Sequence, residues 1–186
     1  MDWYTIEDEF LNYLRGVESR IPYNNYGDDK FKPFFGALFE VGDLIYVSQV
    51  SHAKPRHNNM KNSKDFVKLY KENRLIAVVN LNYMFPVHKS KLIKVEYKDI
   101  DKFRTFKDIK ERSNYINLLN IEKQEIINNG VNNKAKKLYD FKYKYPNNKI
   151  SLRCFDFKNL ESKCYDYINK EIYNITQEIA TDKTTE

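Results

Sequence analysis

Apolar side chains alternate along much of the first half of the chain and recur at helical spacing in the second half. Residues 2–6 (DWYTI) are aromatic and β-branched, which predicts a strand. Residues 7–16 carry apolar groups at helical spacing, and we expect Thr5 to cap this helix and Gly16 to end it.

A period of two begins at residue 34. Segments 34–41 and 44–50, joined by Gly42-Asp43, predict a β-hairpin. Residues 65–70 and 74–80 predict two further strands, and residues 85–97 another one or two.

Helical spacing dominates from residue 99. A long or broken helix is expected over 99–129, and further helices over 132–145 and 156–179. Because strands come first and helices afterwards, the order favours an α+β fold over alternating βαβ units. We expect a single domain over residues 1–180, followed by a frayed tail at 181–186.

Composition and charge narrow the class of protein. The chain is 41% hydrophobic and 15% aromatic, with only 5 Gly and 5 Pro, which favours a globular domain over a disordered one. The net charge is +6, but residues 30–95 contain twelve Lys or Arg and four Asp or Glu. This segment therefore carries a net charge of +8, which favours a polyanionic partner such as nucleic acid.

Cys154 and Cys164 lie ten residues apart with a helix predicted to begin between them, so we expect two reduced thiols and no disulfide. No apolar run is long enough to predict a membrane span. The first ten residues are acidic where a signal peptide is basic, and a cytoplasmic protein is expected.

Common enzyme motifs are absent from the sequence. There is no glycine-rich phosphate loop, no HExxH and no paired CxxC. The two histidines of residues 50–61 stand beside Lys54 and Arg56, which disfavour a metal cation, and no carboxylate occurs between Asp43 and Asp65. We therefore expect no metal site and no other cofactor.

Residues 50–61 (VSHAKPRHNNMK) hold the candidate catalytic side chains Ser51, His52, Lys54 and His57. RNA can be cleaved without metal when one group takes the 2′ proton, another protonates the 5′ oxygen and a cation stabilises the phosphorane. Histidine suits the first two roles and lysine the third. Extended backbone would point Ser51 and His52 to opposite faces, so a solubilising basic loop remains an alternative.

Aromatic and basic residues in and around this segment are candidate RNA contacts. Tyrosines can stack on unpaired bases, and lysine, arginine and asparagine can bind the backbone. The candidates are Tyr4, Lys30, Lys32, Tyr46, Arg56, Asn58, Lys61, Lys89 and Lys91.

Four short motifs follow one another along the chain: WYTI at residues 3–6, KPFFGALFE at 32–40, YVSQVSHAKPRH at 46–57 and VNLNYMFP at 79–86. This series resembles the endoribonuclease toxins of type III toxin–antitoxin systems, the ToxN/AbiQ family. The resemblance implies a twisted antiparallel sheet of the MazF/Kid type elaborated by helices. It also implies metal-independent cleavage that leaves a 2′,3′-cyclic phosphate and a 5′-hydroxyl.

The partners implied by the resemblance are a target RNA and an antitoxin RNA of repeated pseudoknots. The toxin processes this RNA and is inhibited by it in a closed protein–RNA assembly until phage infection releases it. By position, the family's Thr/Ser falls on Ser51, its Lys on Lys54, its His on His57 and its upstream basic residue on Lys32. His52 departs from the pattern, because the family has a second hydroxyl there. Either Ser51 supplies the hydroxyl function or His52 acts as a general base.

A second hypothesis uses the same basic face without catalysis, as an RNA- or DNA-binding regulator. The two hypotheses differ in their products, because only the enzyme yields a 2′,3′-cyclic phosphate.

Overall fold

The computed structural model describes residues 1–27 and 29–182, with side chains placed up to residue 177. The fold is α+β, as predicted. Residues 183–186, most of the predicted tail, lie outside the described residues, and residues 181 and 182 belong to the last helix.

Within the residues that the structure describes, eight strands form one open antiparallel sheet with the order β5-β6-β4-β2-β1-β8, and β3 and β7 also pair with β4. The strands are β1 (Asp2–Ile6), β2 (Phe34–Gly36), β3 (Glu40–Val41), β4 (Leu44–His52), β5 (Phe66–Lys71), β6 (Arg74–Asn80), β7 (Phe85–His88) and β8 (Leu92–Lys94). The predicted strands are thus confirmed, except that the segment predicted as one strand over 34–41 forms two strands, β2 and β3.

Strand β4 is the centre of the sheet. Its first half pairs with β3 and β7, and its second half pairs with β2 and β6. The turn between β3 and β4 is tight because Gly42 adopts a left-handed φ of +58°, a conformation that glycine takes at little cost. The end of β4 is held by β6, with Ser51 opposite Val78 and His52 opposite Ala77.

Six helices accompany the sheet in the described part of the chain: α1 (Asp8–Val17), α2 (Pro55–Asn59), α3 (Ile109–Asn128), α4 (Val131–Lys144), α5 (Lys149–Arg153) and α6 (Phe157–Asp182). Short 3₁₀ turns η1 (Leu81–Tyr83), η2 (Lys89–Lys91) and η3 (Tyr97–Lys102) lie between them.

Both ends of the first helix differ from the prediction, because α1 runs from Asp8 to Val17 and Gly16 lies inside it. Thr5 lies inside β1, and Glu7 precedes α1 without a side-chain cap, so the expected cap at Thr5 is wrong. The helical segment over 99–129 is broken, which is one of the two predicted forms, and Asp108 starts α3 by accepting a hydrogen bond from the Glu111 N–H. Helices α2 and α5 are five residues each, too short to leave a periodic pattern.

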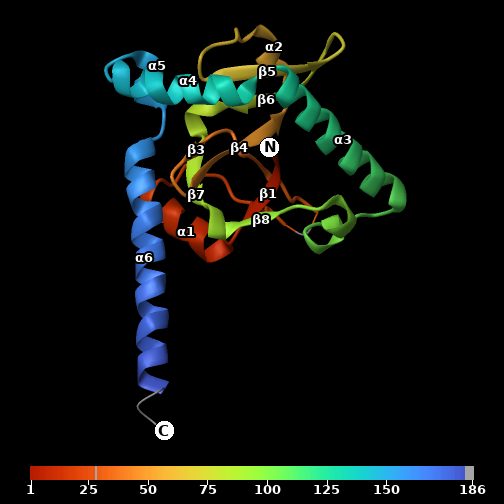
Figure 1. Ribbon diagram of the computed structural model, residues 1–186. Coiled ribbons are helices and arrows are strands. Elements are labelled where there is room, and N and C mark those ends of the chain that lie inside the picture. The colour runs from red at the N-terminus through yellow and green to blue at the C-terminus, as the bar shows by residue number, and fades with distance from the viewer. Residues whose placement is uncertain (28, 183–186) are drawn as a thin grey trace.

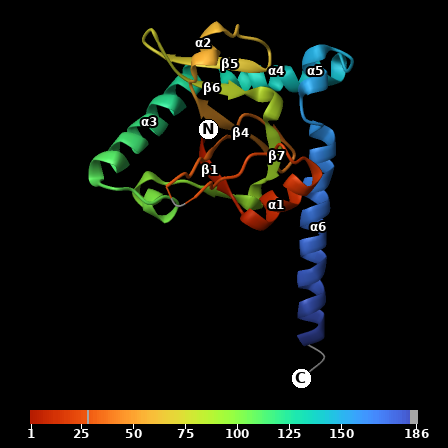
Figure 2. The ribbon, with the colours of Figure 1, turned by 180° about the vertical axis from the view of Figure 1, so that it is seen from behind.

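The helices cover different sides of the sheet (Figures 1 and 2). Helix α6 packs on β7 and α1 and continues beyond the body, whereas α3 lies on the opposite side and contacts β5. The core is rich in aromatic side chains, including Trp3, Phe10, Phe34, Phe35 and Phe85. Cys154 and Cys164 are buried free thiols on either side of the start of α6, as expected.

No helix in the described part of the chain is both long and apolar enough to cross a membrane.

Candidate active site

A pocket of about 500 Å³ opens between the end of β4, the loop before β2 and helix α3. Its basic side chains are Lys30 and Lys32 from the loop and Arg104, which precedes α3. Its aromatic side chains include Trp3, Tyr26, Phe31 and Tyr115. Positive charge beside aromatic rings is the combination that binds unpaired RNA.

His52 is the candidate catalytic residue that lines this pocket. It is the last residue of β4, and its side chain is 60% exposed. Burial of the ring's inner part lowers the pKa of His52, and the charges of Lys32 and Arg104 lower it further. The imidazole is therefore neutral at physiological pH and able to accept a proton.

Glu122 of α3 lies at the floor of the same pocket, where its side chain is 6% exposed. Its Oε1 lies 3.8 Å from the Nδ1 of His52. Burial raises the pKa of Glu122 to about 7. The sequence analysis missed this residue, although it is a carboxylate on the same helical face as the buried Leu119 and Ile126.

The side chain of Ser51 lies on the opposite side of β4 from that of His52. It lines a smaller depression of about 190 Å³ together with Arg20, Asn80 and Tyr83. The alternation of side chains in β4 therefore separates Ser51 from His52, as extended backbone requires. The structure brings His52 together with Lys32 and Lys30, but it does not bring Ser51 into that group.

Lys54 precedes helix α2 in extended backbone, two residues beyond His52, and its side chain is exposed. His57 lies within α2, where only 4% of it is exposed. Its Nδ1 accepts a hydrogen bond from the Lys54 N–H at 3.1 Å, and its ring lies against Phe66. In this conformation His57 fixes the start of α2 and faces neither depression.

Two other candidates, Arg56 and Asn58, lie within helix α2. Arg56 is exposed and its Nε donates to the Nε2 of His57 at 3.4 Å. Asn58 has an exposed side chain, and its carbonyl accepts a hydrogen bond from the Nζ of the buried Lys68 at 2.9 Å.

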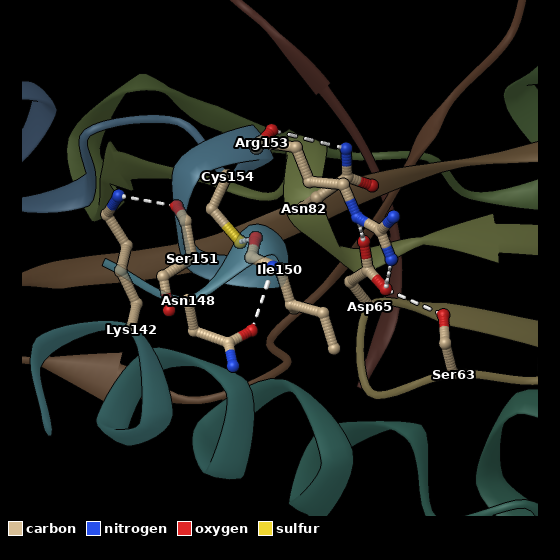
Figure 3. Close-up of polar contacts among 9 residues, drawn as sticks. All are labelled: Ser63, Asp65, Asn82, Lys142, Asn148, Ile150, Ser151, Arg153 and Cys154. Carbon is tan, nitrogen blue, oxygen red and sulfur yellow. Dashed lines mark hydrogen bonds and ion pairs between the residues drawn. The ribbon is translucent and has the colours of Figure 1, made fainter. Parts of the chain in front are cut away.

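Lys61 borders a third depression, together with Tyr83, Asp65 and Arg153. Arg153 of α5 binds Asp65 through two hydrogen bonds, and the Ser63 hydroxyl donates to the same carboxylate at 2.6 Å (Figure 3). Because this pair neutralises Asp65, the carboxylate adds little negative charge to the surface beside Lys61.

Two expected RNA contacts are corrected by the structure. Tyr46 is fully buried, stacks on Phe39 and donates its hydroxyl to Glu161 at 2.7 Å, so it has no surface for a base. Lys91 is 6% exposed and pairs with Glu7 at 3.0 Å and Glu171 at 2.6 Å, which leaves no free charge for a phosphate.

The remaining two candidates lie away from the pocket. Lys89 is exposed and ion-paired with Asp43. Tyr4 is partly buried and packs near Gly36, whereas its neighbour Trp3 lines the pocket. Within the described residues, no three His, Cys, Asp or Glu side chains gather as a metal-binding group.

The α+β fold thus has a basic, aromatic pocket at the end of its central strand, the kind of surface that nucleic-acid-binding proteins use. The model of the ToxN toxin family, from type III toxin–antitoxin systems, matches residues 2–165. The chain belongs to this family, and the resemblance seen in its motifs is confirmed.

Two curated relatives are similar in sequence. The chain is 27% identical over 181 residues to the endoribonuclease ToxN of Bacillus thuringiensis subsp. kurstaki, covering 91% of this chain and 85% of the relative. It is 30% identical over 95 residues to the endoribonuclease ToxN of Pectobacterium atrosepticum, covering 47% of this chain and 54% of the relative.

Solved structures share the fold. AbiQ, a lactococcal anti-phage endoribonuclease of a type III system, aligns with a TM-score of 0.71 at 21% identity, covering 90% of this chain and 98% of that one. A structure of a bacterial type III toxin selectively inhibited by a non-coding RNA pseudoknot aligns with a TM-score of 0.66 at 24% identity, covering 89% and 96% of the two chains.

Proposed function

We propose that this protein is an endoribonuclease toxin and that the pocket at the end of β4 is its active site. The observation that carries the proposal is the position of His52, which lines a pocket together with Lys30, Lys32 and Arg104. Cations bind the RNA phosphates, and a neutral imidazole beside them can take a proton from a 2′-hydroxyl. The endoribonuclease names of both curated relatives support the same activity.

The proposed chemistry is transesterification within the RNA. The 2′-oxygen attacks the adjacent phosphorus as His52 takes its proton. The bond from phosphorus to the 5′-oxygen then breaks, and that oxygen takes a proton from water. His52 gives its proton to the hydroxide that remains, which restores the neutral imidazole. Lys32 and Lys54 stabilise the charge on the phosphorane. The products are a 2′,3′-cyclic phosphate and a 5′-hydroxyl.

Ser51 has a different proposed role. Its hydroxyl lies with Arg20 and Asn80 on the other side of β4, and we assign it a hydrogen bond to the RNA backbone there. His57 is not given a proton-transfer role, since its buried Nδ1 already accepts a backbone hydrogen bond.

The proposed reaction uses no metal ion. Lys32 and Arg104 already place positive charge where a catalytic cation would otherwise stabilise the phosphorane, and they repel a further cation. The cationic side chains therefore replace the metal in this scheme.

We propose that the inhibitor of the toxin is an RNA of repeated pseudoknots, which the toxin processes and which holds it in a closed protein–RNA assembly. Two structural neighbours support this partner: one toxin is inhibited by an RNA pseudoknot, and one antiviral system is regulated by a processed non-coding RNA. Abortive phage defence is the proposed role, as in the anti-phage neighbour AbiQ.

We also propose that the sheet is related to that of the MazF/Kid toxins, on the basis of its antiparallel strands around a long central strand. Superposition on a toxin of that type tests the relation.

The test of function is cleavage of total bacterial RNA by the purified chain in the presence of excess EDTA. We expect fragments with 2′,3′-cyclic phosphate and 5′-hydroxyl ends, and the shortest cleaved oligoribonucleotide then serves as a defined substrate. RNA binding without any cleavage would instead identify a non-catalytic regulator. Activity that disappears with EDTA and returns with a divalent ion would overturn the metal-free scheme.

A further inference from the structure

Glu122 is a carboxylate on the buried face of α3, where apolar side chains are expected. Leu119, Glu122 and Ile126 are the buried residues of this helix and share one face. A carboxylate at such a position costs free energy unless a partner compensates for its burial. Strongly perturbed carboxylates in a pocket therefore point to a functional role.

The partner of Glu122 is His52. Among the described residues, the 3.8 Å contact with the His52 ring is the one ion pair of Glu122, and its carboxylate makes no hydrogen bond. This separation is slightly longer than a hydrogen bond, as is common for catalytic contacts before substrate binds. The carboxylate approaches Nδ1, so Nε2 is the ring nitrogen that Glu122 does not contact.

We propose that Glu122 is a positioning residue that holds the proton of His52 on Nδ1. With the proton there, Nε2 carries the free lone pair that takes the 2′-hydroxyl proton, and the carboxylate stabilises the imidazolium that results. This logic is that of a carboxylate–histidine pair, in which the carboxylate fixes the tautomer and orientation of the base. The inference rests on the proposed function and deepens it.

The surroundings of the pair set the direction of its pH dependence. The groups around it are Lys30, Lys32, Arg104, Asp29, Tyr26 and Tyr115. The Lys32 and Arg104 charges lower the pKa of His52, while burial raises the pKa of Glu122 to about 7. The active form of the pair holds a neutral imidazole beside a carboxylate, so activity falls as the pH drops and the pair gains a proton.

The first experiment compares wild type with Glu122→Gln on the shortest cleaved oligoribonucleotide. We expect kcat to fall by about 10- to 100-fold, the range seen when a group that orients a functional histidine is lost. KM should stay within about twofold because Glu122 does not touch RNA. The acidic limb of the pH–rate profile should move to lower pH, because the carboxylate that titrates near 7 is gone and His52 keeps its lowered pKa.

A double-mutant cycle separates this role from simple packing. In the His52→Ser background, Glu122→Gln should change the residual rate by less than about twofold, because no imidazole remains to be positioned. Glu122→Leu provides a further check, since it should raise the thermal midpoint by removing a buried carboxylate while lowering kcat. Glu125→Gln, on the same helix and outside the pocket lining, is the matched control and should leave kcat unchanged.

Failure of the inference and failure of the function give different results. If wild type cleaves and His52→Ser is inactive, an unchanged kcat and pH profile in Glu122→Gln overturn the inference alone. If wild type cleaves no RNA, the proposed function fails. In that case ¹⁵N spectra of the His52 ring still test the pair: a loss of the Nδ1–H tautomer in Glu122→Gln supports it, and an unchanged ring spectrum overturns it.

Discussion

Ser51 and His52 are consecutive residues that open onto opposite sides of strand β4. Ser51 lines the depression with Arg20 and Tyr83, whereas His52 lines the pocket with Lys32. Pairing with β6 holds this stretch of β4 extended and fixes the alternation. In the proposed function, RNA phosphates bind on the His52 side, where the proton is transferred, and Ser51 adds a hydrogen bond to the RNA backbone from the other side.

The separation predicts different effects for the two side chains. His52→Ala should lower kcat by about 10²- to 10⁴-fold, the range for loss of a general base, with little change in RNA affinity. Ser51→Ala should weaken RNA binding by about tenfold, which is the loss of one hydrogen bond, and leave kcat largely intact. Single-turnover cleavage and RNA binding assays separate the two effects. A larger loss of kcat in Ser51→Ala than in His52→Ala would assign the chemistry to the hydroxyl.

Lys32→Met should raise the pKa of His52. Burial and the Lys32 and Arg104 charges lower this pKa, so removing one cation brings it back toward its ordinary value. The ring of His52 should then titrate at higher pH in an NMR titration of the RNA-free protein. The acidic limb of the pH–rate profile should also move to higher pH.

Lys30→Met is the matched control for Lys32→Met, because Lys30 lines the same pocket but is not among the groups that lower the pKa of His52. An identical titration of His52 in wild type and Lys32→Met would contradict the expected coupling.

The sheet could be predicted from the sequence because most of its strands are short runs rich in β-branched and aromatic residues, with a clear turn at Gly42-Asp43. The break between β2 and β3 was hidden, since Glu40 is the one charged residue in the predicted strand 34–41 and no turn residue other than Gly36 interrupts it. Helix α2 was hidden for a different reason. Its five residues are polar and begin with Pro55, which is favoured at the first helical position but equally common in loops.

From the sequence, only the site residues within short local motifs could be predicted. His52 and Lys32 carry recognisable chemistry, but the partner of His52 is Glu122, which lies 70 positions further along the chain. Tyr46 and Lys91 were misassigned because residue type alone does not show burial. Their partners, Glu161 and Glu171, come from α6 and meet them only in the folded chain.

Lys91→Ala should destabilise the fold rather than weaken RNA binding. Lys91 is 6% exposed and joins Glu7 of the α1 region to Glu171 of α6, so its removal leaves two carboxylates close together. We expect a loss of about 1–3 kcal/mol in the free energy of unfolding, since both carboxylates retain contact with water. Chemical denaturation measures this loss.

Lys89→Ala is the matched control for Lys91→Ala. Lys89 pairs with Asp43 at the surface, where both side chains are more than half exposed. Its loss should cost much less stability than the loss of Lys91, because water screens an exposed ion pair. Equal destabilisation by the two substitutions would show that burial of Lys91 does not strengthen its ion pairs.

Asp65→Asn should lower stability in a way that depends on pH. Asp65 precedes β5 and accepts two hydrogen bonds from Arg153 of α5, and its side chain is 3% exposed (Figure 3). Burial acts to raise the pKa of Asp65, but the hydrogen bonds from Arg153 and Ser63 outweigh it, and the pKa lies below its ordinary value of 3.8. A carboxylate with a lowered folded-state pKa contributes stability above pH 3.8, and this contribution is lost as the pH falls through the folded-state pKa.

The difference in stability between wild type and Asp65→Asn should therefore be largest near neutral pH, at about 1–3 kcal/mol. It should shrink below pH 3.8. There the Asp65 carboxyl is protonated in the unfolded chain but still charged in the folded one, so folding must release a proton. Urea denaturation at several pH values measures the difference. Asp140→Asn, which removes an exposed pair with Lys136, should show almost no difference at any pH. If the Asp65→Asn difference stays constant down to pH 2.5, the ion pair with Arg153 is not its source, because a charged pair must weaken as its carboxylate is protonated.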